Sequence, residues 1–107
     1  MSPARRRLPN RRASETFRFR CEPFEYVATI SRFPDDGALA EIFISNGKAG
    51  SGSDTAAKDA AVICSIGLQY GVPLDVIRHA LLRDSRGVAS SPLGVALDLI
   101  AGETVAK

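Results

Sequence analysis

The fold is decided by the stretch YVATISRFPDDGALAEIFI, which occupies residues 26–44. Its two ends, residues 26–33 and 39–44, are rich in the β-branched and aromatic residues that favour strands. Between them, Pro34 and Gly37 enclose two aspartates. This composition is typical of a tight turn, because proline fixes φ and glycine accepts a positive φ. The stretch therefore predicts an antiparallel β-hairpin.

A further strand is predicted just before the hairpin, at residues 16–21, where the sequence TFRFRC alternates apolar and charged residues. Successive side chains of a strand point to opposite faces of the sheet. We therefore expect Phe17, Phe19 and Cys21 to face the core, whereas Arg18 and Arg20 face the solvent.

A helix is predicted after the glycine-rich loop at residues 47–53, because the apolar residues change from a period of two to helical spacing. The apolar stripe consists of Ala57, Ala60, Ala61, Cys64 and Leu68, and Ile63 and Ile66 widen it. Ser53 or Asp54 is expected to cap the start of this helix. Gly71 is expected just beyond its end.

Two shorter helices are predicted in the remainder of the chain. Residues 73–82 form the first, with Leu74, Ile77 and Leu81 facing inward. The second covers residues 92–100: Ser91 followed by Pro92 resembles an N-cap and a first-turn proline. We expect Gly102 to close this last helix.

The order β-β-β-α-α-α predicts an α+β domain. It would contain a small antiparallel sheet of about three strands, followed by about three helices packed on one face. A parallel α/β fold would instead require strands that alternate with helices. Residues 1–14 are predicted to be a flexible basic arm, because Pro3 and Pro9 oppose a helix and apolar residues are nearly absent. Residues 15–107 form the domain.

The net charge of +2 conceals an asymmetry along the chain. Through residue 20 the sequence carries seven arginines against Glu15 alone, and the rest of the chain is net acidic. Basic arms of this kind contact nucleic acid or an acidic partner surface, although a solvated leader has the same composition. The candidate contact residues are Arg5, Arg6, Arg7, Arg11, Arg12, Arg18 and Arg20.

The loop at residues 47–53 is a second candidate site, because the free N–H groups of the following helix could bind an anion. Weak anion contact would use Lys48, Gly50, Gly52 and Ser53. The glycine spacing fits neither the dinucleotide fingerprint nor the P-loop, and Ala49 replaces the Ser or Thr that a P-loop needs after its lysine. The sequence favours a flexible connection.

No catalytic, cofactor-binding or metal site is predicted. Cys21 and Cys64 are the only cysteines and His79 is the only histidine, so no cysteine or histidine spacing typical of a metal site occurs. No apolar stretch approaches the ~20 residues that span a bilayer, and no secretory signal is visible. These features predict a cytoplasmic protein that does not enter a membrane.

Three segments carry a resemblance to a known family: LPNRR at residues 8–12, Gly37 with EIFI at 41–44, and SIGLQYGVPL at 65–74. Together they resemble the TSCPD domain, which closes the chain of many cobalamin-dependent (class II) ribonucleotide reductases. The motif that names the family stands here as ASSPL at residues 89–93. Ser91 and Leu93 thus replace the motif's thiol and acid. The resemblance implies that the fold is kept and thiol chemistry is lost.

The resemblance implies a non-catalytic accessory or regulatory domain, a free-standing copy related to class II reductases that binds a protein or nucleic-acid partner. A reductase is a possible partner. Ribonucleotide reduction needs three thiol roles and a cobalamin site, which two cysteines do not provide, so we expect neither enzyme activity nor a cofactor. One alternative is a small nucleic-acid-binding protein that uses the arm. Another is a small enzyme or nucleotide binder built on the loop at 47–53. The oligomeric state is not predicted.

Overall fold

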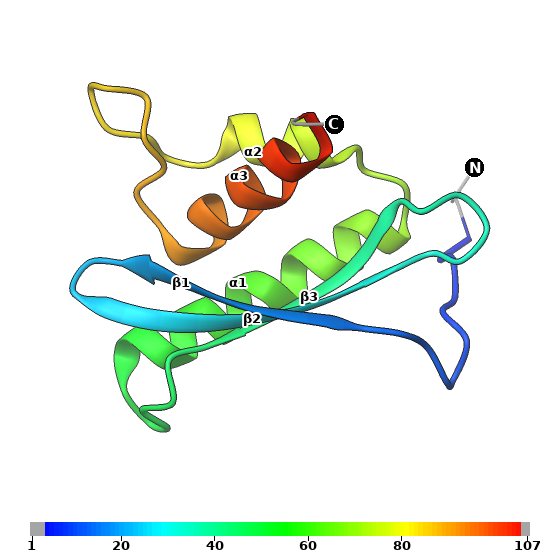
Figure 1. The fold of residues 1–107 in the computed structure, drawn as a ribbon, viewed down its shortest axis with the longest axis horizontal. Coiled ribbons are helices and arrows are strands. Elements are labelled where there is room, and N and C mark those ends of the chain that lie inside the picture. The colour runs from blue at the N-terminus through cyan, green and yellow to red at the C-terminus, as the bar shows by residue number, and fades with distance from the viewer. Residues whose placement is uncertain (1–3, 106–107) are drawn as a thin grey trace.

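The structure is a computed structural model that describes residues 4–105; residues 1–3 of the predicted arm and residues 106–107 of the predicted domain lie outside the described part. Within it, strands precede helices, as the sequence predicts (Figure 1). The elements are β1 (Glu15–Cys21), β2 (Phe24–Arg32), β3 (Leu39–Ser45), α1 (Gly52–Gln69), α2 (Leu74–Ala80) and α3 (Pro92–Val105). The predicted α+β class is confirmed.

The sheet is antiparallel with the strand order β1-β2-β3. In its register Phe19 lies opposite Tyr26, and Ala28 lies opposite Ile44. These residues share one face, since side chains alternate along each strand. That face is buried: Tyr26, Ala28 and Ile44 are at most 3% exposed.

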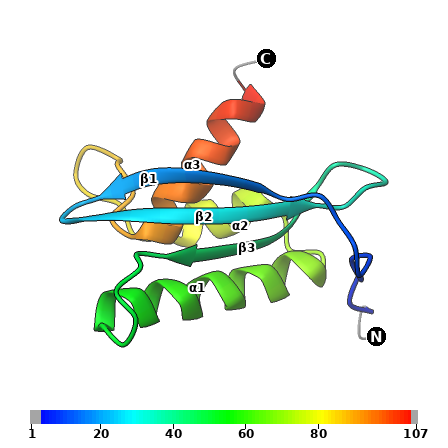
Figure 2. The same ribbon diagram turned by 60° about the horizontal axis from the view of Figure 1, so that its bottom comes forward.

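The helices cover the buried face of the sheet, and Figure 2 shows α2 and α3 behind the strands and α1 running alongside β3. Apolar side chains from α1 and α3 complete the core: Ala57, Ala61, Cys64, Leu68, Leu93, Ala96, Leu97 and Ile100. Helix α2 is shallower, and its Leu74 and Ile77 pack against the edge of this core. The inward residues predicted for the first two helices are confirmed, apart from part of the α1 face.

Helix α1 also protects the free edge of β3. Ser65 Oγ accepts a hydrogen bond from the Ile42 N–H, and Gln69 Nε2 donates to the Ala40 carbonyl. Both side chains are buried. An unpaired edge strand would expose its backbone groups to other chains, so these contacts close the sheet on this side.

Three local predictions are wrong. The N-cap of α1 is Ser51, which accepts from the Asp54 N–H, because Asp54 itself turns back to bond the end of β3. Ile63 does not widen the buried face but is 69% exposed. Helix α3 continues through Gly102, which does not adopt the positive φ of a helix-ending glycine.

Other helix ends match their predictions. Gly71 has φ +96°, and the Val72 N–H bonds the Gly67 carbonyl, which is the arrangement expected beyond the end of α1. At the start of α3, Ser91 Oγ accepts from the Gly94 N–H. None of the helices that the structure describes is long and apolar enough to span a membrane.

Candidate partner-binding surface

The second face of the sheet has no helix over it (Figure 2). By alternation it carries the side chains of Thr16, Arg18, Arg20, Glu25, Val27, Thr29, Ser31, Glu41, Phe43 and Ser45. We call this set the open sheet face. At one end, residues 9–14 lie against it, since they line hollows together with Ser31 and Glu41. The middle is uncovered, and Phe43 there is 49% exposed.

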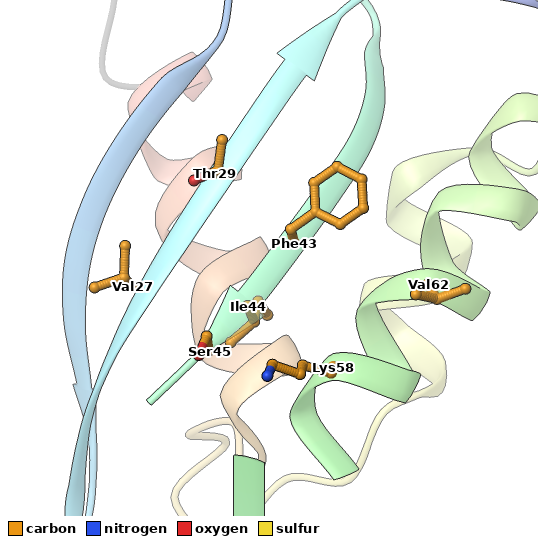
Figure 3. Close-up of a pocket in the computed structure, with 7 residues that line it drawn as sticks. All are labelled: Val27, Thr29, Phe43, Ile44, Ser45, Lys58 and Val62. Atoms are coloured by element: carbon orange, nitrogen blue, oxygen red, sulfur yellow. The ribbon is translucent and has the colours of Figure 1, made fainter. Parts of the chain in front are cut away.

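A groove of about 370 Å³ opens between the middle of this face and α1 (Figure 3). Val27, Thr29 and Phe43 line it from the sheet, and Lys58 and Val62 line it from α1. The Phe43 ring projects toward the α1 side of the groove (Figure 3). The surface is therefore mainly apolar, with one ammonium group at its margin. Such a lining is more typical of a protein-binding surface than of a catalytic site.

Four of the seven candidate arginines already have carboxylate partners. Arg6 reaches Asp35 at 2.9 Å and stacks over the Phe33 ring at 3.6 Å. Arg20 pairs with Glu22 at 2.6 Å, and Arg18 lies 3.8 Å from Glu25. The fourth, Arg12, pairs with Glu41. These pairings reduce the positive field that the sequence predicted for the arm.

The other three arginines have no carboxylate partner within residues 4–105. The Nε of Arg5 donates to the side-chain oxygen of Gln69 at 2.7 Å. Arg7 and Arg11 are exposed and make no hydrogen bond or ion pair with the residues that the structure describes. The arginines at residues 5–12 thus lie beside the domain, and the predicted flexibility of the arm stays a prediction.

Arg12 and Glu41 bring together two of the segments that carry the family resemblance. The guanidinium donates to both carboxylate oxygens, at 2.8 and 3.1 Å, and the Glu41 side chain is only 8% exposed. Burial opposes ionisation of Glu41, but hydrogen bonds from Arg12 and Ser31 outweigh it and lower its pKa. The pair fastens the arm to the open sheet face.

The third of these segments, residues 65–74, fixes the end of α1 against β3 and the core. Ser65 and Gln69 lie one turn apart on α1 and face β3, Gly71 ends the helix, and Leu74 packs at the edge of the core. The sequence analysis missed the two polar contacts. Their signal is two polar residues at i and i+4 beside an apolar stripe, which places them on the same helix face.

The N-terminus of α1, where the sequence predicts weak anion contact, already holds a carboxylate of the chain itself. Asp54 is 1% exposed, and it accepts from the Asn46 N–H and Ser45 Oγ, both at 2.9 Å. Its ion pair with Lys58, together with these bonds, lowers its pKa. Lys48 lies 5.9 Å from the Phe24 ring. Anion contact through Lys48, Gly50, Gly52 and Ser53 stays a prediction.

Neither cysteine has the lowered pKa of an activated thiolate. Burial raises the pKa of Cys64 to about 11, and burial followed by the Glu22 charge raises that of Cys21. Both are free thiols. At the position of the family's motif acid, Leu93 is 5% exposed and belongs to the core. Among residues 4–105, no three His, Cys, Asp or Glu side chains cluster as metal ligands would.

These segments also belong to the part of the chain that matches a known domain family. The TSCPD domain model matches residues 5–101. The chain belongs to the TSCPD domain family. Its match covers the arm from Arg5, all three strands and most of α3, so the segments at the open sheet face are part of the shared domain.

The curated relatives of this TSCPD domain are far longer proteins. A vitamin B12-dependent ribonucleotide reductase from Streptantibioticus cattleyicolor is 40% identical over 73 residues, which are 68% of this chain and 12% of the relative. That of Streptomyces clavuligerus is also 40% identical, over 8% of its length. That of Bradyrhizobium diazoefficiens is 51% identical over 41 residues, 38% of this chain and 3% of the relative. No solved structure matches significantly.

Proposed function

We propose that this TSCPD domain is a non-catalytic accessory unit that binds the catalytic part of a vitamin B12-dependent ribonucleotide reductase through its open sheet face. The observation that carries the proposal is the position of the helices. They cover one face of the sheet and the free edge of β3, and leave Phe43 and Val27 on the other face without a cover.

The composition of the face supports a protein partner. A half-exposed phenylalanine beside Val62, which is 44% exposed, offers the aromatic and aliphatic contact area found at the centre of protein interfaces. The polar margin of Thr29, Ser45 and Lys58 resembles an interface rim. When one face of a sheet is already buried, apolar side chains on the other face contribute to stability only if another surface packs on them.

The relatives support the choice of partner. Each relative is a vitamin B12-dependent ribonucleotide reductase, and the matched segment is at most 12% of the chain in the Streptantibioticus and Streptomyces proteins. Because the matched segment is covalently joined to the remainder of such a chain, that remainder is the protein surface nearest to it. A contact with that remainder would be independent of thiol chemistry, in agreement with the raised pKa of both cysteines.

Nucleic acid is the less favoured partner because four of the seven candidate arginines already pair with carboxylates of the domain. Within the part of the chain that the structure describes, Arg5, Arg7 and Arg11 have no carboxylate partner, and the few phosphate contacts that three arginines offer give weak, salt-sensitive binding. The proposed role is therefore protein binding first.

The experiment is a calorimetric titration of this chain into a vitamin B12-dependent reductase truncated to remove its own TSCPD domain. We expect saturable binding that changes little between 50 and 300 mM salt. Fluorescence anisotropy with labelled DNA and RNA at the same two salt concentrations tests the alternative. Nucleic-acid binding that is tighter than reductase binding at the higher salt contradicts the proposal.

The non-catalytic part has its own assay. The chain alone, incubated with adenosylcobalamin, ribonucleotides and a dithiol, is expected to form no deoxyribonucleotide. Any turnover above the protein-free control that disappears in the Cys21→Ser variant contradicts this part of the proposal.

A further inference from the structure

We propose that a hollow at the C-terminal end of α1, lined by Arg5, Arg7 and Gln69, binds the terminal phosphate of a small phosphorylated molecule. The inference does not depend on the proposed reductase contact, because neither Phe43 nor the groove beside it lines this hollow.

The chain at this hollow is held in place by Gln69. The backbone N–H of Arg6 donates to the Gln69 carbonyl at 2.8 Å, and the Arg5 Nε donates to the Gln69 side chain at 2.7 Å. Gln69 is itself 7% exposed and fixed to the Ala40 carbonyl at 3.0 Å. The arginine side chain is thus oriented before any ligand arrives, which lowers the entropy lost on binding.

The guanidinium N–H donors that remain available at the hollow are those of Arg5 and Arg7. Arg6 and Arg12 also line it, but their guanidinium groups are bonded to Asp35 and Asp36 and to Glu41. Among the described residues, the two terminal nitrogens of Arg5 have no partner, and Arg7 has none for its whole guanidinium group. Two unpaired guanidinium groups two residues apart can each donate a pair of hydrogen bonds to phosphate oxygens.

One acidic group lies at the hollow, and it is already neutralised. Glu41 accepts two hydrogen bonds from Arg12, which leaves its side chain 8% exposed. The four arginines and one glutamate that line the hollow therefore leave a positive balance at its mouth. An anion placed there would contact Arg5 and Arg7 ahead of the Glu41 carboxylate.

The size of the hollow selects the ligand. Its volume is about 260 Å³, enough for one or two phosphate groups but small for a continuous nucleic-acid backbone. A terminal phosphate also carries nearly two negative charges at neutral pH, whereas an internal phosphodiester carries one. The two positive charges of Arg5 and Arg7 match the nearly two negative charges of a terminal phosphate.

The test is a calorimetric titration with pyrophosphate and with tripolyphosphate, for the unchanged chain, Arg7→Gln and Arg11→Gln. Arg11 is the matched control, because it too is exposed and unpaired but does not line the hollow. We expect saturable binding that weakens at least tenfold in Arg7→Gln and less than twofold in Arg11→Gln. Equal weakening in the two variants, or no saturable binding by the unchanged chain, overturns the proposal.

Two further arms identify the source of the phosphate. A nucleoside triphosphate that binds tighter than tripolyphosphate identifies a nucleotide, and equal affinity identifies the phosphate chain alone. An oligonucleotide without terminal phosphates is expected to compete poorly; competition equal to that of tripolyphosphate contradicts the proposal. The Phe43→Ala variant should keep full phosphate affinity, so a failure of the reductase contact remains separate from a failure of this site.

Discussion

The Ser65 hydroxyl on α1 accepts a hydrogen bond from the Ile42 N–H on β3 at 2.8 Å and lies 3.0 Å from the carbonyl of the same residue. One helix side chain thus takes the place of a neighbouring strand. The contact fixes α1 at the edge of the sheet, and that position leaves Lys58 and Val62 beside Phe43 on the open sheet face. A structural hydrogen bond therefore shapes the proposed binding surface.

Removing this hydroxyl should destabilise the domain. In Ser65→Ala the buried Ile42 N–H loses its partner, which costs about 1–3 kcal/mol of unfolding free energy. Urea unfolding followed by circular dichroism measures the loss. Ser85→Ala, at an exposed turn, is the control and should change stability little. Equal stability of the two variants would show that the Ser65 contact contributes nothing.

The link between the arm and the sheet should also be measurable. Arg12→Ala leaves the carboxylate of Glu41 buried without its counter-charge, whereas Arg11→Ala removes an equal charge that has no partner among the residues that the structure describes. We expect the unfolding midpoint to fall clearly in Arg12→Ala and to stay near the wild-type value in Arg11→Ala. A double change of Arg12 and Glu41 to Ala and Gln should lose less than the two single losses added, because the two groups interact. Additive losses would argue against the pair.

The same pair predicts the direction of acid denaturation. The pKa of Glu41 is lower in the folded state than in the unfolded chain, where it is about 4.3. Between the two values the unfolded state binds more protons, so the stabilisation is complete above about pH 4.3 and is lost as pH falls through the folded pKa. Thermal unfolding between pH 7 and 3 should show a shallower decline for Glu41→Gln than for the unchanged chain. Asp54 and Asp98, whose pKa values are also lowered, should preserve part of the decline in the variant. Parallel curves would contradict this role of Glu41.

The two cysteines should differ in access to reagents. Cys64 is 4% exposed with a pKa of about 11, whereas Cys21 is partly exposed at the end of β1. A thiol reagent at pH 8 should modify Cys21 in the folded protein and Cys64 only after unfolding. Cys64→Ala should cost about 1 kcal/mol through the small cavity it opens. Rapid labelling of two thiols in the native state would show that the core opens easily.

The order of elements was predictable because local patterns determine it. Alternation at residues 16–21, the turn at Pro34–Gly37 and the helix signals at Ser91 and Gly71 each act within a few residues. Two of the three wrong local predictions have the same cause. The position of Ile63 and the cap at Ser51 depend on how α1 lies against β3, which is a contact between segments distant in the sequence.

The candidate site was predictable only in part for the same reason. The arginines were recognised from composition, but their pairing with Glu41, Glu25 and Asp35 depends on the tertiary fold. Phe43 alternates with Ile42 and Ile44 in a continuous apolar run, so its outward direction follows from the sheet register. The order of elements predicts helices on one face of the sheet, but it does not show which part of the other face the arm covers.

The central claim is that the open sheet face binds the catalytic part of a vitamin B12-dependent reductase. The most direct measurement is calorimetric affinity for the truncated reductase, compared between Phe43→Ala and Leu82→Ala. Leu82 is 80% exposed and follows α2, on the helix side of the domain, so it controls for loss of an exposed apolar side chain. The account predicts that Phe43→Ala weakens binding at least tenfold, or about 1.4 kcal/mol, while Leu82→Ala leaves it within twofold. Unchanged affinity in Phe43→Ala, with the variant fully folded, would contradict the claim.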